Sequence, residues 1–448
     1  MRIDRLELRN FKKFAAFDLD LHRQFTLLIG ENGAGKTSVL DALAVALGVW
    51  LVEPPDSTLI NSRRGIYASE IRLESSQRGD RELFSEAIGD VSVKATGQIA
   101  GRDNLVWERR IRQGKRKATN LGAKEALAVI AAAYERATRE DSVLLPVIAY
   151  YGAGRAWLAH RERPRSGVAA NGPARRWAAF YDCLNERIRI ADLGDWFHRE
   201  AIAAVNRGGR FRPGFEVVRQ AVLRCVPDAD RMWFDGDRGE IALSIEGRAQ
   251  PFSNLSAGQR MMLALVSDIA IKAVTQNNHL VPKDARAALN GALPDVLAQT
   301  PGVVLIDELD VHLHPRWQRR VASDLKSTFP GIQFICTSHS PQVIGEVLPE
   351  EIRMLDDAAL GRSPDQSYGL DSNAILEDLM GAKSRTPTGE RAIEAVEDAL
   401  DEGDLARARE QLAGLKKLQH GDTRDTARLE AMINNLEILT DEGDSSPE

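Results

Sequence analysis

The stretch from Gly30 to Thr37 constrains the fold more than any other part of the sequence. It reads Gly-Glu-Asn-Gly-Ala-Gly-Lys-Thr and fits the phosphate-binding pattern G-x-x-x-x-G-K-[ST]. The apolar run 25–29 before it predicts a buried strand, and residues 37–47 after it carry apolar side chains at helical spacing. A strand, a glycine-rich loop and a helix N-terminus together can hold a triphosphate. The sequence therefore predicts a nucleoside triphosphate site.

Each part of this phosphate loop has an expected role. The glycines let the backbone approach phosphate oxygens, Lys36 brings a positive charge to the β- and γ-phosphates, and Thr37 offers its hydroxyl to Mg²⁺. We expect ATP and Mg²⁺ as cofactors. The residues expected to contact the nucleotide here are Asn32, Gly33, Ala34, Gly35, Lys36, Thr37 and Ser38.

Composition excludes several classes of protein. The chain has 448 residues and a formal net charge of −6, so nucleic acid could bind only through a local basic patch. Three widely spaced cysteines exclude a disulfide framework. No apolar stretch approaches the roughly 20 residues that a membrane-spanning helix needs. We therefore expect a cytoplasmic protein without membrane contact.

The arginine-rich segment 155–224 is the one candidate for such a patch. It contains Arg161, Arg163 and Arg165, and further arginines follow up to Arg224. This segment is interpreted in two ways, as a DNA-contacting surface or as a solvated or internally paired face.

Periodicity and turn residues divide the chain into six parts. Short alternating segments between Tyr67 and Arg112 predict an antiparallel insertion, and no part sustains the heptads of a coiled-coil arm. The expected parts are residues 1–60 with the phosphate loop, 61–120 as an antiparallel β subdomain, 121–154 as a helix and a strand returning to the core, 155–225 as an arginine-rich helical insertion, 226–355 as a second lobe, and 356–448 as a helical C-terminal extension with an acidic tail.

A second motif, Leu-Ser-Ala-Gly-Gln over residues 255–259, precedes the apolar helical run 261–274. Ser256 is placed as the N-cap of this helix, and Gly258 is expected to leave the helix N-terminus sterically open. A helix N-terminus of this kind favours an anion such as a γ-phosphate.

Two apolar strands are each followed by polar residues. Residues 303–306 lead into Asp307 and Glu308, and residues 332–336 lead to His339. The 32 residues from Asp307 to His339 suit one βαβ crossover, so we expect these side chains at one edge of a parallel sheet. Asp307 would hold Mg²⁺, and Glu308 would orient or deprotonate the attacking water. His339 would reach the γ-phosphate.

A zinc site at His312, His314 and His339 is rejected because no cysteine or further carboxylate completes a tetrahedral set. His314-Pro315 is better explained as the entry to a helix.

These motifs, in this order, resemble the ABC-type ATPase heads of the RecF, SMC and OLD group. The opening Ile3-x-x-Leu6-x-Leu8-x-Asn10-Phe11-Lys12-x-Phe14 is similar to the N-terminus of that group, and residues 307–315 resemble its D-E-x-x-x-x-L-H-P segment. The resemblance implies an α/β fold: a P-loop ATPase head with a mixed sheet, an inserted antiparallel β subdomain, a helical insertion and a helical C-terminal extension.

The resemblance also implies roles for particular residues. Two heads would clamp face to face, with Ser256 and Gly258 of one head completing the nucleotide site of the other. Asp310 would transmit the state of one nucleotide site to the other across the interface between the heads. The N-terminal turn would contact the nucleotide through Arg9, Asn10, Phe11 and Lys12.

Within this group the chain is similar to bacterial anti-phage ATPases of the Septu, retron and PARIS systems, such as PtuA and AriA. There are two departures. No glutamine follows the strand ending at Tyr151, where many ABC ATPases place a residue that senses Mg²⁺ and water, so that role is unassigned. Gln259 is kept where many defence relatives have an aromatic residue.

The leading hypothesis is a slow, regulatory ATPase whose homodimer or higher homo-oligomer gates a separate effector, such as an HNH nuclease, in anti-phage defence. No carboxylate cluster of a TOPRIM nuclease follows His339. The alternative is a RecF-like DNA-binding ATPase in repair or recombination, which would use segment 155–224. A transporter subunit is a third reading, disfavoured by the 220 residues between Lys36 and Ser256.

Overall fold

The computed structural model describes residues 1–78, 81–140, 142–156, 176–284, 291–355 and 361–444. The chain divides into two compact units, Met1–Ile375 and Leu376–Glu448. The C-terminal extension therefore begins later than the expected residue 356, because the chain up to Ile375 packs within the first unit; the side chain of Ile375 is fully buried there.

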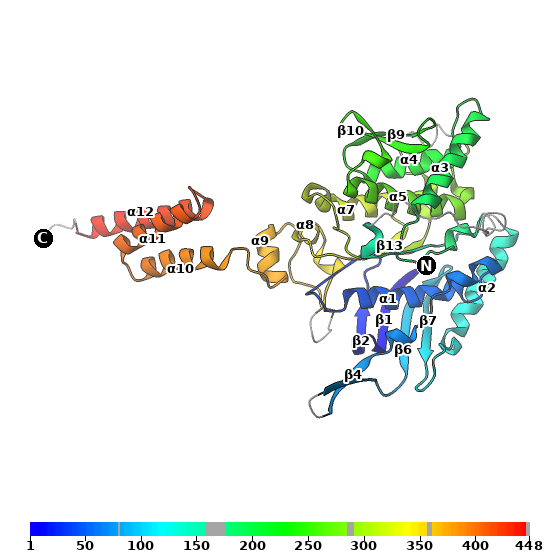
Figure 1. Cartoon of the computed structure of the whole chain (residues 1–448), viewed down its shortest axis with the longest axis horizontal. Helices are drawn as coiled ribbons and strands as arrows, with labels where there is room; N and C mark the ends of the chain where they lie inside the picture. Colours follow the sequence, from blue (N-terminus) through cyan, green and yellow to red (C-terminus); the bar gives the residue numbers. More distant parts are fainter. Residues whose placement is uncertain (79–80, 141, 157–175, 285–290, 356–360, 445–448) are drawn as a thin grey trace. The chain divides into compact units, whose positions relative to one another are not determined.

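The strand that precedes the phosphate loop, β3, belongs to a sheet of five parallel strands (Figure 1). Their order is β14-β3-β13-β12-β8, and every neighbouring pair is parallel. The four strands β3, β8, β12 and β13 are buried along their whole length, as expected for a sheet covered on both faces. Their bounds are β3 Phe25–Ile29, β8 Val147–Tyr151, β12 Gly302–Ile306, β13 Ile332–Thr337 and β14 Ile352–Met354.

A second sheet is antiparallel, with the order β2-β1-β6-β7. Strands β6 and β7 come from the segment expected to form a separate subdomain, but they extend the N-terminal hairpin: Leu6 pairs with Ala95 and Leu8 with Val93. The expected mixed sheet is thus divided into one parallel and one antiparallel sheet. The bounds are β1 Arg2–Phe11, β2 Phe14–Asp20, β6 Val91–Ile99 and β7 Arg102–Ile111.

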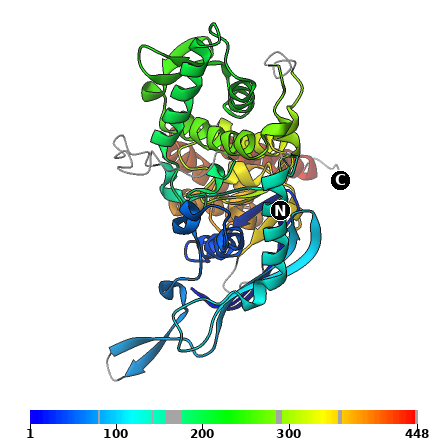
Figure 2. The same cartoon turned by 90° about the vertical axis from the view of Figure 1, so that its right-hand side faces the viewer.

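Helix α1, Lys36–Leu47, packs against strands of both sheets. This position explains why the helix is apolar almost all round and why ten of its residues are buried. Its start is thereby fixed at the carboxyl edge of the parallel sheet. A two-stranded ribbon, β4 Leu73–Arg78 and β5 Arg81–Glu86, extends from the same part of the unit (Figure 2).

The other part of the first unit is mainly helical and contains a small antiparallel sheet, β11-β10-β9. Helix α5 is buried because α3, α4 and β8 all pack against it. The bounds are β9 Ala229–Asp235, β10 Glu240–Ile245, β11 Arg248–Pro251, α2 Lys124–Arg139, α3 Ile190–Val205, α4 Pro213–Cys225, α5 Ala257–Gln276, α6 Asp295–Gln299, α7 Pro315–Thr328, α8 Pro341–Ile344 and α9 Ser372–Ala374.

The second unit consists of α10 Pro387–Asp401, α11 Leu405–Leu418 and α12 Arg424–Asp444. These helices share a core that includes Val396, Leu412 and Ile433. Gly403, in the turn between α10 and α11, has a φ of +74°.

The predicted α/β fold class is confirmed. The described residues include no helix that combines the length and apolarity needed to cross a bilayer.

Candidate functional site

The phosphate loop joins β3 to α1 at the carboxyl edge of the parallel sheet. Gly33 and Gly35 have φ values of +83° and +99°, which residues with a Cβ rarely adopt. A Cβ on Gly35 would also lie 2.6 Å from the ring of Phe14. Asn32 and Gly33 are exposed, Ser38 is half-buried, and Ala34 is buried, so Ala34 can offer only its backbone to a ligand.

Lys36 lies across this loop. Its Nζ donates to the carbonyl oxygens of Gly30 and Glu31, at 2.8 and 2.9 Å. Burial lowers the pKa of Lys36, while the carboxylates of Asp307 and Glu308 act in the opposite direction. The ammonium is therefore held at the loop by backbone acceptors, where a phosphate would be a stronger partner.

Lys13 and Phe14 contact the phosphate loop from the N-terminal turn. Lys13 Nζ donates to the carbonyl oxygen of Gly33 at 2.8 Å, and the Phe14 ring lies against Gly35. The sequence motif included Phe14, but it assigned contact with the nucleotide to residues 9–12. The structure adds that Asn10 and Lys12, in the same turn, have positive φ values of 50° and 47°.

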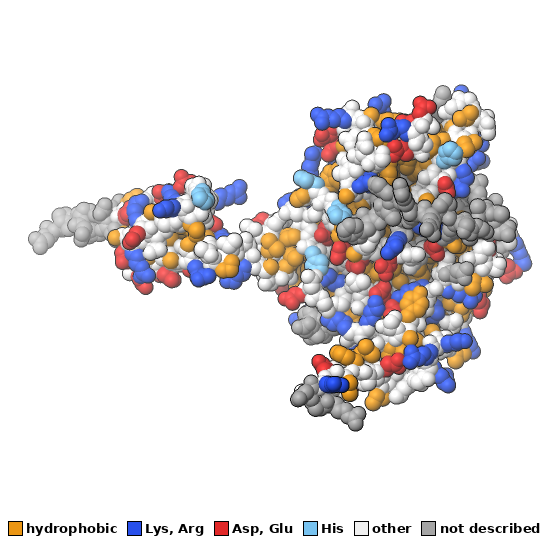
Figure 3. Space-filling model, in the orientation of Figure 1, with side chains coloured by type: hydrophobic (Ala, Val, Ile, Leu, Met, Phe, Trp, Pro, Cys, Tyr) orange, Lys and Arg blue, Asp and Glu red, His pale blue; other side chains and the backbone are white. Residues whose placement is uncertain are grey.

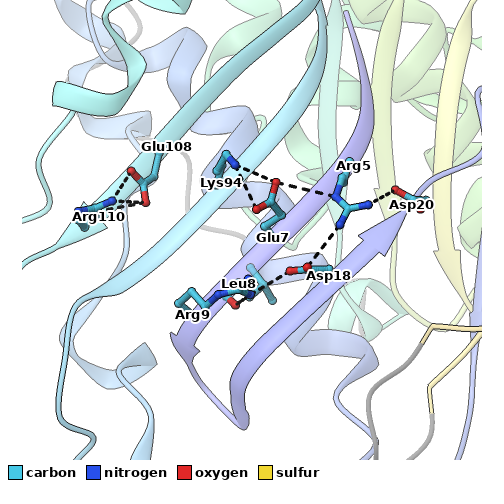
Figure 4. Close-up of polar contacts among 9 residues, drawn as sticks. All are labelled: Arg5, Glu7, Leu8, Arg9, Asp18, Asp20, Lys94, Glu108 and Arg110. Carbon is cyan, nitrogen blue, oxygen red and sulfur yellow. Dashed lines mark hydrogen bonds and ion pairs between the residues drawn. The ribbon is translucent and has the colours of Figure 1, made fainter.

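The side chains of residues 9–12, which were expected to contact the nucleotide, have partners within the protein. Arg9 is paired with Asp18 on the neighbouring strand, at 2.9 Å (Figure 4). Asn10 donates to the carbonyl oxygens of Ile88 and Asp90. Phe11 is fully buried in the core. The structure therefore assigns contact with the phosphate loop to Lys13 and Phe14 instead of these residues.

Lys12 reaches the phosphate-loop helix instead of the loop itself. It forms an ion pair with Asp41, which lies one helical turn after Thr37. Arg64 donates to Glu70 at 2.5 and 2.9 Å and lies 3.9 Å from Asp41, which extends the pair into a network. Burial raises the pKa of Asp41, and the cations Lys12 and Arg64 oppose this.

Asp307, which follows β12, contacts both Thr37 after the phosphate loop and Thr337 at the end of β13. Thr37 Oγ1 donates to Asp307 Oδ2 at 3.0 Å, although 270 residues separate them in the sequence. Thr337 Oγ1 donates to Asp307 Oδ1 at 2.6 Å. A carboxylate and a hydroxyl at one point are the oxygen donors that Mg²⁺ prefers, so these residues fit the expected cation.

No three His, Cys, Asp or Glu side chains among the described residues are close enough to form a metal cage. This is compatible with Mg²⁺, which is commonly held by one or two carboxylates together with water and substrate phosphates.

Glu308 is held in a conformation that non-glycine residues seldom adopt, with a φ of +50°. Two contacts to Thr337 fix it: Glu308 N donates to Thr337 Oγ1 at 2.7 Å, and the next residue, Leu309, donates its N–H to the Thr337 carbonyl at 2.8 Å. The side chain is half-buried beside Asp307. No role was predicted for Thr337, although it lies between the predicted strand 332–336 and His339.

Asp310 and His339 are brought together, as their strands are neighbours. Ser338 Oγ donates to Asp310 Oδ1 at 2.5 Å, and His339 N donates to the same oxygen at 3.3 Å. His339 is half-buried. Asp310 therefore fixes the segment that carries His339.

Ser256 is the N-cap of α5, as predicted. Gln259 N donates to Ser256 Oγ at 3.3 Å, and Ser256 N donates to Gln259 Oε1 at 2.9 Å, which completes a capping box. Gly258 itself is buried, and a Cβ there would lie 2.5 Å from the carbonyl oxygen of His312. Gly258 therefore permits close approach of the segment that follows Asp310.

The arginine-rich segment falls partly outside the described residues, which exclude 157–175 and hence Arg161, Arg163 and Arg165. The described arginines include several with internal partners. Arg176 donates to the Ala137 carbonyl at 2.6 Å, and Arg212 pairs with Glu200 at 3.1 Å. On the face of the molecule shown in Figure 3, basic and acidic side chains are interspersed.

Two family models match the chain. One, described as "AAA domain", matches residues 5–195, and another, described as "AAA domain, putative AbiEii toxin, Type IV TA system", matches residues 246–345. They include the phosphate loop and the carboxylate edge, respectively.

Two of the relatives match over about four-fifths of the chain, and a third matches over a short part of it. The "Retron Vc95 probable ATPase" of Vibrio cholerae serotype O1 biovar El Tor is 25% identical over 409 residues, which cover 80% of this chain and 74% of that protein. The "Septu protein PtuA" of Bacillus mycoides is 24% identical, over 79% of this chain but only 40% of that protein. The "DNA replication and repair protein RecF" of Photorhabdus laumondii subsp. laumondii is 32% identical, over 18% of this chain and 27% of that protein.

The order of motifs, the parallel sheet and these relatives agree. Together they support an ATPase of the RecF/SMC group that is similar to the ATPases of anti-phage defence systems.

Proposed function

We propose that this chain is an ATP-hydrolysing switch whose two heads close on shared nucleotides and thereby gate a separate effector protein in anti-phage defence. One observation carries the proposal: at one sheet edge Thr37 donates to Asp307, and Thr337 contacts both Asp307 and Glu308. An edge with a phosphate loop, a cation-binding carboxylate and a second, fixed carboxylate is the equipment of a magnesium-assisted hydrolase.

The residues divide the work as follows. Lys36 exchanges its two carbonyl acceptors for phosphate oxygens, and the loop N–H groups bind the rest of the triphosphate. Thr37 and Asp307 would hold Mg²⁺, which when bound neutralises charge on the β- and γ-phosphates. Glu308 orients or deprotonates the attacking water, and His339 contacts the γ-phosphate.

Two copies are needed because the start of α5 belongs to a different site from its own phosphate loop. Within the residues described, no hydrogen bond or ion pair links Ser256 or Gly258 to residues 30–38. Ser256 is exposed, so its hydroxyl is accessible to the nucleotide of a second head. His312, two residues after Asp310, packs against Gly258 at the start of α5. Asp310 would therefore communicate the state of one nucleotide site to the other.

The effector is assigned to another polypeptide, and a nuclease such as an HNH enzyme is the first candidate. The relatives named for Septu and retron systems support a role in defence. The second unit, a separate helical bundle, offers a surface for such a partner.

Co-expression of the chain with the product of the neighbouring gene tests this function. We expect the two proteins to purify together and expect Glu308→Gln, which slows hydrolysis, to change the activity of the partner. Lys36→Ala is the matched control, since it removes nucleotide binding and should leave the partner in one state. Cleavage of DNA by the purified chain alone would overturn the proposal.

A further inference from the structure

A cavity of about 510 Å³ lies beside the phosphate-loop helix, at the end of β8. Its lining is mostly charged and includes Lys12, Asp41, Arg64, Tyr150, Asn185 and Glu186. The cations Lys12 and Arg64 are already paired with Asp41 and Glu70. Glu186 is an exposed carboxylate in this lining that the function described above does not use.

Glu186 is placed by the glycine that follows β8. Gly152 N donates to the Glu186 carbonyl at 2.9 Å, and Tyr150 N donates to the Cys183 carbonyl at 2.9 Å. A Cβ on Gly152 would lie 2.7 Å from both Cβ and Oε2 of Glu186. Gly152 is therefore required for this approach, which explains the Tyr-Tyr-Gly sequence at the end of the strand.

This position brings Glu186 within electrostatic range of Asp307, the carboxylate that accepts from Thr37. Strand β8 pairs with β12, Ile306 is opposite Tyr151, and Asp307 N donates to the Tyr151 carbonyl at 2.8 Å. Burial raises the pKa of Glu186, and the charges of Asp41 and Asp307 raise it further. Without a cation, these carboxylates repel one another and a triphosphate.

We propose that Glu186 is a positioning residue for the hydrated Mg²⁺ of the nucleotide site. Its place at the end of β8, on Gly152 and beside Asp307, carries the inference, which rests on the proposed nucleotide-binding function. Glu186 acts through water, because Mg²⁺ keeps several of its waters and no three acidic side chains among the described residues come close enough to ligate one ion directly. The role left without a glutamine is thus filled by a carboxylate from a later loop.

A carboxylate in this role has a signature that a structural role lacks. Glu186→Gln removes negative charge and keeps the shape of the side chain. Binding of an ATP analogue without Mg²⁺ should be unchanged or tighter, because repulsion falls. Binding with Mg²⁺ should weaken by about tenfold, the lower end of what loss of an outer-shell partner does to metal sites. The ratio of the two affinities is therefore the quantity to measure.

Isothermal titration of the full chain with a non-hydrolysable ATP analogue, in Mg²⁺ and in EDTA, tests the proposal. Asn185→Ala, in the same loop and without a charge change, should leave both affinities unchanged. Gly152→Ala displaces Glu186 and should lower the ratio of the affinities with and without Mg²⁺ in the same way as Glu186→Gln. Its melting curve shows whether it has folded. If it has not folded, the result for Glu186→Gln alone decides.

Equal affinities for wild type and Glu186→Gln, or equal weakening with and without Mg²⁺, would overturn the role of Glu186 alone. A wild-type chain that binds no analogue in Mg²⁺ would overturn the proposed function, and this inference with it.

Discussion

Replacement of Thr337 by valine tests the two hydrogen bonds that hold Asp307 and Glu308 at the edge of the parallel sheet. The Thr337 hydroxyl donates to Asp307 Oδ1 at 2.6 Å and accepts from Glu308 N at 2.7 Å, and the side chain is fully buried. Valine has the same shape, so packing is kept and only the two hydrogen bonds are lost. A bond to a charged group contributes roughly 1.5–3 kcal/mol, and an unpaired buried N–H costs roughly 1–3 kcal/mol.

We therefore expect Thr337→Val to lower the free energy of unfolding by about 3 kcal/mol. Hydrolysis should fall more than nucleotide binding, because Glu308 loses one of the two contacts that hold its positive φ. Chemical denaturation followed by fluorescence measures the first effect, and phosphate release with analogue titration measures the second.

Thr337→Ser is the matched control for this change. It keeps the hydroxyl and removes one methyl group, so it should lose only about 1 kcal/mol and retain hydrolysis. A Thr337→Val protein as stable and as active as Thr337→Ser would refute the reasoning, because the two hydrogen bonds would then contribute nothing measurable.

Three further substitutions test other parts of the site. Lys36→Ala should weaken ATP binding by about 100-fold, since a charged hydrogen-bond donor to phosphate is removed; titration would contradict this if affinity were unchanged. Glu308→Gln should bind ATP normally and hydrolyse it at least about 100-fold more slowly, and normal phosphate release would exclude Glu308 as the base. Gly258→Ala should lose about 1–3 kcal/mol of stability because its Cβ would lie 2.5 Å from the His312 carbonyl; a melting curve identical to wild type would show that the segment yields freely.

Local features of the sequence were sufficient for the individual elements. Helix α2, Lys124–Arg139, and strand β8 both lie in the part 121–154 that was expected to contain a helix and a strand. The strands before Asp307 and His339 lie side by side, as their spacing predicts. These features depend on periodicity and on the length of the crossover between parallel strands, and both can be read from residues that are close together in the sequence.

Long-range pairing could not be predicted in the same way. Strands β6 and β7 alternate as any antiparallel pair does, and nothing in that pattern selects β1 as their neighbour. Gln333 bonds the backbone of Ile3 and His22 from within β13, which joins the two sheets through contacts that no motif records.

The same limit applied to the candidate site. Arg9 and Lys13 lie in one short motif, and only the positive φ at Asn10 and Lys12 decides which of them reaches the phosphate loop. Glu186 meets Gly152 across a stretch of chain that carries no recognisable pattern. Side chains that are placed by the fold, not by a motif, were the ones missed.

Cross-linking between two distinguishable copies tests most directly whether the nucleotide site is shared. Asn32 in the phosphate loop and Ala257 beside Ser256 are exposed, and the three native cysteines, Cys183, Cys225 and Cys336, are buried. Chains carrying Asn32→Cys and chains carrying Ala257→Cys, with different tags, would be mixed with a short bismaleimide. The account predicts a covalent pair of the two chains that forms with ATP and Mg²⁺ and disappears when Lys36→Ala is added to the first chain. Absence of that pair, or equal yield without ATP, would contradict it.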